Sequence, residues 1–250
     1  MRNLVVLLAL AWVCLAMAAY AATHQVRVEM SGTERCIVSN GIPDHSVGQF
    51  PNAGNPHTIL EQNISFCVTS QPVKGTTPQM VPTVGIAENG IIIRPGTADY
   101  YDASSRRGHS RDRSSGWNLD GMGPGNTLGL DQNNAHVDNR GIYHYHGVPD
   151  ALVNVSQDSL IGWAADGFEI HYVGDGAKPS FALKRGTRPT APGGTYDGTY
   201  NEDFEYVQNY GNLDQCNGAM TSTGAYVYFA TDAYPFYPRC LWGTRITRFR

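Results

Sequence analysis

The chain has 250 residues, of which 41% are hydrophobic and only 16% are charged, and its formal net charge is −4. Collagen, coiled coils and long helical bundles need a regular repeat, which this sequence lacks. Its 14 tyrosines, 8 phenylalanines and 4 tryptophans supply enough apolar area for a folded core. The acidic balance provides no basic face for nucleic acid.

The first 21 residues predict a signal peptide. Arg2 precedes an uncharged apolar run over residues 4–18, and Ala19-Tyr20-Ala21 supplies the small-x-small pattern that signal peptidase reads. The run is too short for a convincing membrane span, and no second apolar stretch of that kind follows it. We therefore expect a secreted or extracytoplasmic protein, periplasmic in a bacterial host, with no integral membrane segment after cleavage.

Short β-like runs separated by Gly, Pro and Asn clusters predict a mostly β fold. We expect a single domain of short antiparallel strands, with long Gly/Pro-rich loops and little helix. Residues 22–79 would form an N-terminal β segment, packed on or part of a main domain at 80–250. The one expected helix covers residues 150–159. The expected strands cover residues 26–30, 36–39, 64–69, 91–94, 142–146, 160–163, 168–173 and 225–230.

Export changes the interpretation of the cysteines. Besides one cysteine in the signal segment, the chain has Cys36, Cys67, Cys216 and Cys240, an even number for an oxidising compartment. Four cysteines allow three pairings, which sequence does not distinguish. We prefer the local pairs Cys36–Cys67 and Cys216–Cys240, because each would join two neighbouring β-like segments. A four-thiolate metal site is the alternative, but the sequence has no C-x-x-C pair.

Two local patterns predict surface segments. Residues 104–116 contain Arg106, Arg107, Arg111 and Arg113 among serines, with Asp112, and favour an exposed, solvated loop. A basic binding patch is the alternative interpretation of this loop. In a eukaryotic host the protein would be a glycoprotein, because two glycosylation sequons are present, Asn63-Ile64-Ser65 and Asn154-Val155-Ser156.

The histidines are clustered. Four of the eight, His136, His144, His146 and His171, fall within 36 residues. Because side chains alternate along a strand, His144 and His146 would share one face and the two flanking tyrosines the other. Two imidazoles placed in this way can converge on one metal ion at nitrogen–metal distances of about 2.0–2.1 Å. An antiparallel return through residues 137–141 would bring His136 beside them as a third nitrogen ligand.

The alternative is that these histidines only hydrogen-bond to neighbours within the core. His171 faces the same way as Glu169 and is expected at the surface, with a fourth metal ligand as the alternative. Asp166 precedes a glycine and is first interpreted as part of a tight turn between two strands. If the site is catalytic, Asp166 or Glu169 is the candidate proton acceptor.

The residues Tyr143-His144-Tyr145-His146-Gly147 resemble the motif that gives the YHYH domain proteins their name. Other blocks are similar to that family in the same order: residues 128–131 leading to His136, residues 160–168, residues 213–218 and residues 231–240. The resemblance covers roughly residues 80–243. It implies an exported protein with a histidine-centred site, and it leaves the biochemical role open.

By this match, the resemblance transfers His136, His144 and His146 as site residues, with Asp131 and Asp166 as supporting groups. One departure is Phe168-Glu169-Ile170, where similar sequences often carry proline between the two apolar residues. This departure leaves the role of Glu169 open.

The leading functional hypothesis is an exported protein that binds copper or zinc through three histidines, because imidazole sites suit both ions. Copper is slightly favoured by the flanking tyrosines and the oxidising compartment. A metalloenzyme is one form of this hypothesis. The alternative is a non-catalytic extracellular module that binds glycan or matrix and whose histidines are structural. The sequence predicts no particular protein partner.

Overall fold

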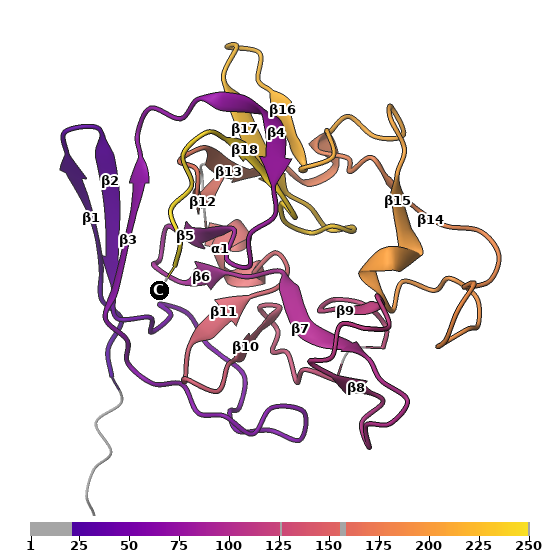
Figure 1. The fold of residues 1–250 in the computed structure, drawn as a ribbon. Helices are drawn as coiled ribbons and strands as arrows, with labels where there is room; N and C mark the ends of the chain where they lie inside the picture. The colour runs from indigo at the N-terminus through magenta and orange to yellow at the C-terminus, as the bar shows by residue number, and fades with distance from the viewer. Residues whose placement is uncertain (1–21, 126, 156–158, 250) are drawn as a thin grey trace, which may run out of the picture.

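An eight-stranded sheet forms the centre of the structure, a computed structural model that describes residues 22–125, 127–155 and 159–249 (Figure 1). Neighbouring strands run antiparallel, except for two parallel pairs: β11 (Tyr143–Tyr145) with β6 (Ile92–Ile93), and β13 (Glu169–Tyr172) with β17 (Tyr226–Ala230). The predicted signal peptide lies outside the described residues. In spatial order the strands are β10 (Ala135–Val137), β11 (Tyr143–Tyr145), β6 (Ile92–Ile93), β5 (Gly85–Ala87), β12 (Leu160–Ala164), β13 (Glu169–Tyr172), β17 (Tyr226–Ala230) and β16 (Gly218–Met220).

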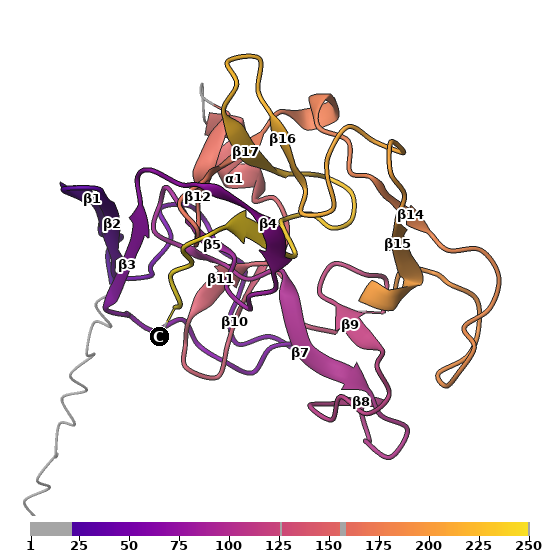
Figure 2. The ribbon, with the colours of Figure 1, turned by 45° about the horizontal axis from the view of Figure 1, so that its top comes forward.

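Four smaller sheets surround the central one. The first three strands form one flank of the molecule and the β14–β15 pair lies at the opposite flank (Figures 1 and 2). The smaller sheets are β1 (Val26–Ser31), β2 (Glu34–Ser39) and β3 (Ile64–Thr69); β8 (His109–Ser110), β7 (Gly96–Tyr101) and β9 (Asn118–Asp120); β14 (Phe181–Leu183) and β15 (Phe204–Tyr206); and β18 (Leu241–Gly243) and β4 (Lys74–Gln79). The helical elements are α1 (Asp150–Val155) and the 3-10 turns Gly174–Gly176 and Asn201–Asp203.

The core is built mainly from β-branched and aromatic side chains of the central sheet. Ile86, Ile92 and Ile93 are fully buried, as are the rings of Tyr143 and Tyr145. Burying each large apolar side chain stabilises the fold by about 1.5–3 kcal/mol relative to leaving it exposed. Short strands are therefore sufficient for a stable fold, because the stability comes from side chains that pack across the sheet and not from the length of each strand.

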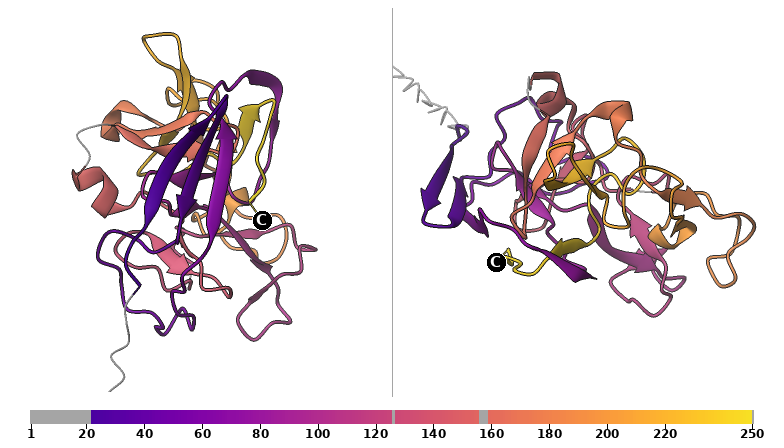
Figure 3. Two further views of the ribbon diagram at one scale, coloured as in Figure 1. Left: turned by 90° about the vertical axis from the view of Figure 1, so that its left-hand side faces the viewer. Right: turned by 90° about the horizontal axis from the view of Figure 1, so that it is seen from above.

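The C-terminal segment packs against the N-terminal three-stranded sheet, which Figure 3 shows face-on. The ring of Phe249 lies 6.3 Å from that of Phe66, between centroids, and the Thr247 hydroxyl donates to the carbonyl oxygen of Cys67. Phe66 itself is buried in the same core as the central sheet. The C-terminal segment is thus held against β3 and, through Phe66, against the main core.

Both disulfides join segments that are adjacent in space. Cys36 and Cys67 are directly opposite each other on β2 and β3, and their sulfurs are bonded. Cys216 is bonded to Cys240, which lies just before β18. Of the three pairings that sequence allows, the structure contains the two local ones.

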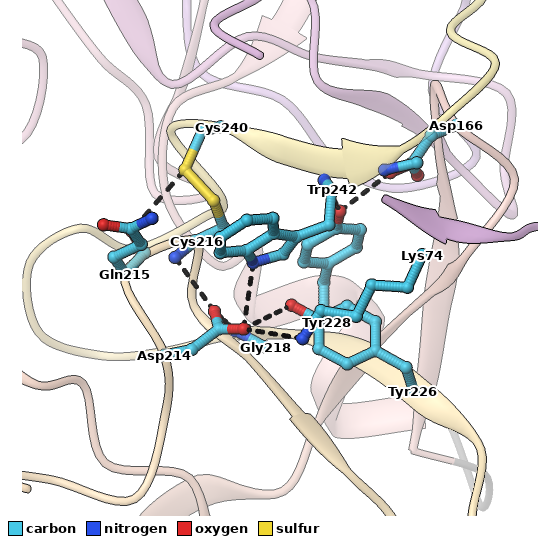
Figure 4. The surroundings of a disulfide bond; sticks show 11 residues. Lys74, Asp166, Asp214, Gln215, Cys216, Gly218, Tyr226, Tyr228, Cys240 and Trp242 are labelled. Carbon is cyan, nitrogen blue, oxygen red and sulfur yellow. Dashed lines mark hydrogen bonds and ion pairs between the residues drawn. A yellow bond between two sulfur atoms is a disulfide. The ribbon is translucent and has the colours of Figure 1, made fainter. Parts of the chain in front are cut away.

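Asp214 anchors the second disulfide to the strands around it (Figure 4). One carboxylate oxygen accepts hydrogen bonds from the backbone N–H groups of Cys216 and Gly218, at 2.9 and 3.1 Å. The other accepts from the Tyr226 hydroxyl at 2.8 Å and the Trp242 indole N–H at 2.9 Å. One side chain therefore fixes the loop that carries Cys216 against both β17 and β18.

The predicted fold class is confirmed: the chain is mostly β, with little helix, and each expected strand segment contains a strand. Most strand pairs are antiparallel as expected, and the two parallel pairs lie in the central sheet. The described helix ends at Val155, and residues 156–158 lie outside the described residues. Strands such as β4, which contains Gly75 and Pro78, were not predicted, because their pairing with distant β18 leaves no local pattern.

Candidate metal centre

The three histidines of the cluster come from one β-hairpin. β10 pairs antiparallel with β11, and the register places His136 directly opposite His144. The connecting turn is closed by a hydrogen bond from the Gly141 N–H to the Asp138 carbonyl at 2.9 Å, and Gly141 has a φ of 78°. That conformation favours glycine, so the residue fixes the turn and thereby the register. His146 follows β11 and lies on the same face as His144.

The three imidazole rings face one another. Their centroids are separated by 4.7 Å between His136 and His144, 4.8 Å between His136 and His146, and 4.9 Å between His144 and His146. One ligand nitrogen from each ring lies within 4.8 Å of the other two. The Nε2 atoms of His144 and His146 are only 3.1 Å apart. Both side chains are 2% exposed, whereas His136 is half-buried.

Each ring is oriented by a backbone carbonyl at its other nitrogen. The Nδ1 atoms lie 3.0 Å from the Leu128 oxygen for His136, 3.1 Å from the Ile142 oxygen for His144 and 3.2 Å from the Pro95 oxygen for His146. A carbonyl oxygen only accepts hydrogen bonds, so Nδ1 carries the proton in His144 and His146, whereas His136 Nδ1 also lies 3.1 Å from the donor nitrogen of the Asn55 side chain. The Nε2 lone pairs of His144 and His146 are then left facing each other. Metal-ligating histidines in proteins typically have this kind of outer hydrogen bond.

Burial keeps these imidazoles neutral. It is the main cause that lowers the pKa of all three histidines, well below the ordinary value for His144 and His146. The positive charge of Arg94 lowers the pKa of His144 further, whereas the hydrogen bond to Leu128 acts in the opposite direction on His136. Neutral imidazole is the form that coordinates a metal.

Two arginines whose charge acts on the cluster have carboxylate partners of their own. Arg94 Nη1 lies 3.0 Å from Asp138, and Arg239 Nη2 lies 2.7 Å from the buried carboxylate of Asp120. Pairing reduces the field that each guanidinium imposes on a cation at the histidines. The charges of these two arginines are therefore partly offset at the cluster.

The opposite face of the hairpin is a layer of tyrosines. The Tyr143 hydroxyl donates to Asp131 at 2.7 Å, and the Tyr145 hydroxyl accepts from Asn89 at 3.0 Å. Asp131 also accepts from the Gly48 backbone N–H at 3.1 Å. The structure thus places Asp131 on the tyrosine side, where it fixes the strand that carries His144. It holds none of the imidazoles directly.

The structure does not bring the candidate acids to the cluster. Asp166 accepts from the Tyr228 hydroxyl at 2.7 Å and from the Gly243 N–H at 2.8 Å, and burial raises its pKa. Glu169 lies on β13, where it contacts His171 Nε2 at 2.9 Å. His171 also contacts the Ser159 hydroxyl at 2.8 Å. Since all three are committed elsewhere, we assign Asp166, Glu169 and His171 no role at the metal centre.

Other residues of the site gave no recognisable sequence signal. The buried side chain of Asn55 donates to the Val137 carbonyl at 2.8 Å, and its nitrogen lies 3.1 Å from His136 Nδ1. Residues such as Pro95 and Leu128 contribute only backbone carbonyl oxygens, which any residue type provides. Asn55 comes from the segment between β2 and β3, so the N-terminal part of the chain completes the site.

A cavity of about 610 Å³ opens over the cluster and is lined by all three histidines. Small-molecule sites in proteins typically measure about 300–1,000 Å³. His136 is the partly exposed member of the three, so a further ligand could approach the imidazoles from this cavity. A three-imidazole set with one open side is typical of catalytic rather than structural metal sites.

The fold and the cluster define a disulfide-bonded β-sheet protein with a candidate three-histidine metal centre. The family model described as YHYH protein matches residues 65–243, and the chain belongs to the YHYH family. The matched range contains all three histidines, and it begins before residue 80, where the resemblance in the sequence blocks begins. A search of the curated proteins finds no match. A search of the solved structures also finds none.

Proposed function

We propose that this chain is an exported metal-binding protein in which His136, His144 and His146 hold one copper or zinc ion. The observation that carries this proposal is the 3.1 Å separation of the Nε2 atoms of His144 and His146, with both ring protons committed to carbonyls on the far side. Two buried lone pairs that face each other without a proton are unfavourable. A cation between them removes that cost.

The donor set fits such an ion. Two nitrogens at about 2.0–2.1 Å from a tetrahedral metal are about 3.3 Å apart, close to the separation between His144 and His146. Three neutral imidazoles suit both copper and zinc. When bound, the ion would supply Lewis acidity or an activated water at the open position. The chain's contribution is to hold three nitrogens in place and to shield them from solvent.

The proposed location rests on separate observations. The N-terminal sequence has the pattern of a signal peptide, and disulfides persist in oxidising compartments. Within the described residues, no helix is both long and apolar enough to cross a membrane. In a eukaryotic host Asn63, which is exposed, is the sequon position whose side chain the structure describes.

The test is the metal content of the untagged protein, measured by mass spectrometry after reconstitution with copper or zinc and removal of loosely bound metal. We expect about one ion per chain and its loss in His136→Gln, which changes the most exposed of the three ligands. His171→Gln is the matched control, because His171 is also a partly buried histidine but lies outside the cluster. No retained metal in the folded wild-type protein, or equal retention in His136→Gln, would contradict the proposal.

A further inference from the structure

The cavity over the histidines has an excess of positive charge. Four arginines line it, and the two lining carboxylates leave a formal excess of two positive charges before any metal ion is counted. The arginines are Arg94, Arg107, Arg111 and Arg140, and the carboxylates are Asp99 and Asp138. The excess is local, because the whole chain has a net charge of −4.

One wall of the cavity holds arginines that are already paired. Asp138 contacts Arg94 at 3.0 Å and Arg140 at 3.7 Å, so two guanidinium groups share one carboxylate. Arg94 is largely buried, with an 18% exposed side chain, whereas the side chain of Arg140 is 56% exposed. This wall therefore stays slightly positive and is held in place by Asp138.

The remaining positive charge of the cavity comes from the segment between β7 and β9. Arg107 and Arg111 are exposed there, and neither guanidinium group makes an ion pair with a carboxylate in the described part of the chain. Sequence alone favoured a solvated loop for this segment. Both arginines are exposed, as expected for such a loop, and of the four arginines on the loop these two also line the cavity that contains the histidines.

We propose that the cavity binds a small molecule that carries a carboxylate or phosphate group, with Arg107 and Arg111 holding this anionic group beside the metal centre. The inference rests on the proposed function, for which it names the class of ligand. Guanidinium groups bind carboxylate and phosphate oxygens in a planar, two-point geometry that lysine does not provide. A cavity of about 610 Å³ has room for such a molecule between the arginines and the histidines.

The test is calorimetric titration of the full mature chain with succinate, with inorganic phosphate and with succinamide, a neutral molecule of nearly the same shape as succinate. Each titration is done with and without copper or zinc. We expect succinate or phosphate to bind at least tenfold more tightly than succinamide. The stronger of the two anions identifies the preferred group, carboxylate or phosphate.

The variant Arg107→Gln/Arg111→Gln should weaken anion binding at least tenfold while it retains the metal content of the wild type. The matched control is Arg106→Gln/Arg185→Gln, which removes the same charge from exposed arginines outside the cavity. Anion binding equal to that of succinamide, or equal in both variants, would overturn the inference. The titrations without metal test the arginines independently of the histidines. Failure of the protein to bind metal would therefore contradict the proposed function but not the inference about the anion.

Discussion

Gly121 lies directly against the imidazole of His146. A Cβ atom at position 121 would overlap His146 Nδ1 and come within 3.2 Å of the ring carbons Cγ and Cε1. The same ring nitrogen donates to the Pro95 carbonyl, so it cannot move aside without losing that hydrogen bond. The absence of a side chain at 121 thus keeps the ring in the orientation that directs Nε2 toward His144.

We predict that Gly121→Ala weakens metal binding by at least tenfold, because the added methyl group displaces the His146 ring. The measurement is a competition titration against a chromophoric chelator. Gly96→Ala is the control: a Cβ at Gly96 meets nothing within 4 Å, although this glycine also lines the cavity. An affinity in Gly121→Ala equal to that of the control would show that the ring position does not limit binding.

The histidine cluster also makes stability depend on pH. The pKa of each ring is lowered in the fold, mainly by burial, whereas an unfolded histidine has a pKa of about 6.5. Below that pH the unfolded chain takes up protons that the folded chain does not. The stabilising contribution is therefore complete above about pH 6.5 and is lost as pH falls through the lower folded-state values.

We predict that the metal-free protein loses about 1.4 kcal/mol per pH unit for each histidine protonated only in the unfolded chain, between about pH 6.5 and 5. Urea denaturation at several pH values measures this slope. His144→Gln should show a smaller slope than the wild type. Bound metal should shift the loss of stability to lower pH, since protons and metal compete for Nε2. An unchanged slope in His144→Gln would contradict the assignment.

The second disulfide is expected to stabilise the fold without taking part in the site. Cys216 and Cys240 are separated by 24 residues, and the chain-entropy estimate for a loop of that size is about 3–4 kcal/mol. We predict a loss of that size in Cys216→Ser/Cys240→Ser, measured by denaturant unfolding, with metal content retained. A larger loss would show that the Asp214 network depends on the disulfide. Loss of metal from the folded variant would contradict the separation of the two regions.

Asp166 is expected to act structurally. We predict that Asp166→Ala lowers the free energy of unfolding by about 2–4 kcal/mol, because the Tyr228 hydroxyl and the Gly243 N–H lose their buried acceptor. Asp166→Asn, which retains an acceptor oxygen, should lose less. Metal content should match the wild type in both folded variants. A fall in metal content at unchanged stability would instead place Asp166 at the site.

Much of the strand pattern was predictable because it depends on local composition. The segment that contains Ile92 and Ile93 is apolar and bounded by turn residues, and the segment at 143–145 alternates tyrosine and histidine. Strand β4 was not predictable, because glycine and proline within it give no β signal and its partner lies far along the chain. The parallel pairing of β11 with β6 was likewise a result of packing and not of local sequence.

For the site, the amino-acid sequence by itself determined which histidines cluster: period-2 alternation and a short turn were enough to place His136, His144 and His146 on one face. Only the tertiary structure decided which atoms they present, because that depends on carbonyl oxygens such as that of Pro95, which arrive from distant segments. It also separated Asp166 from the cluster and brought the loop arginines to the cavity. Contacts between residues far apart in the chain depend on how whole strands pack, and no local pattern encodes them.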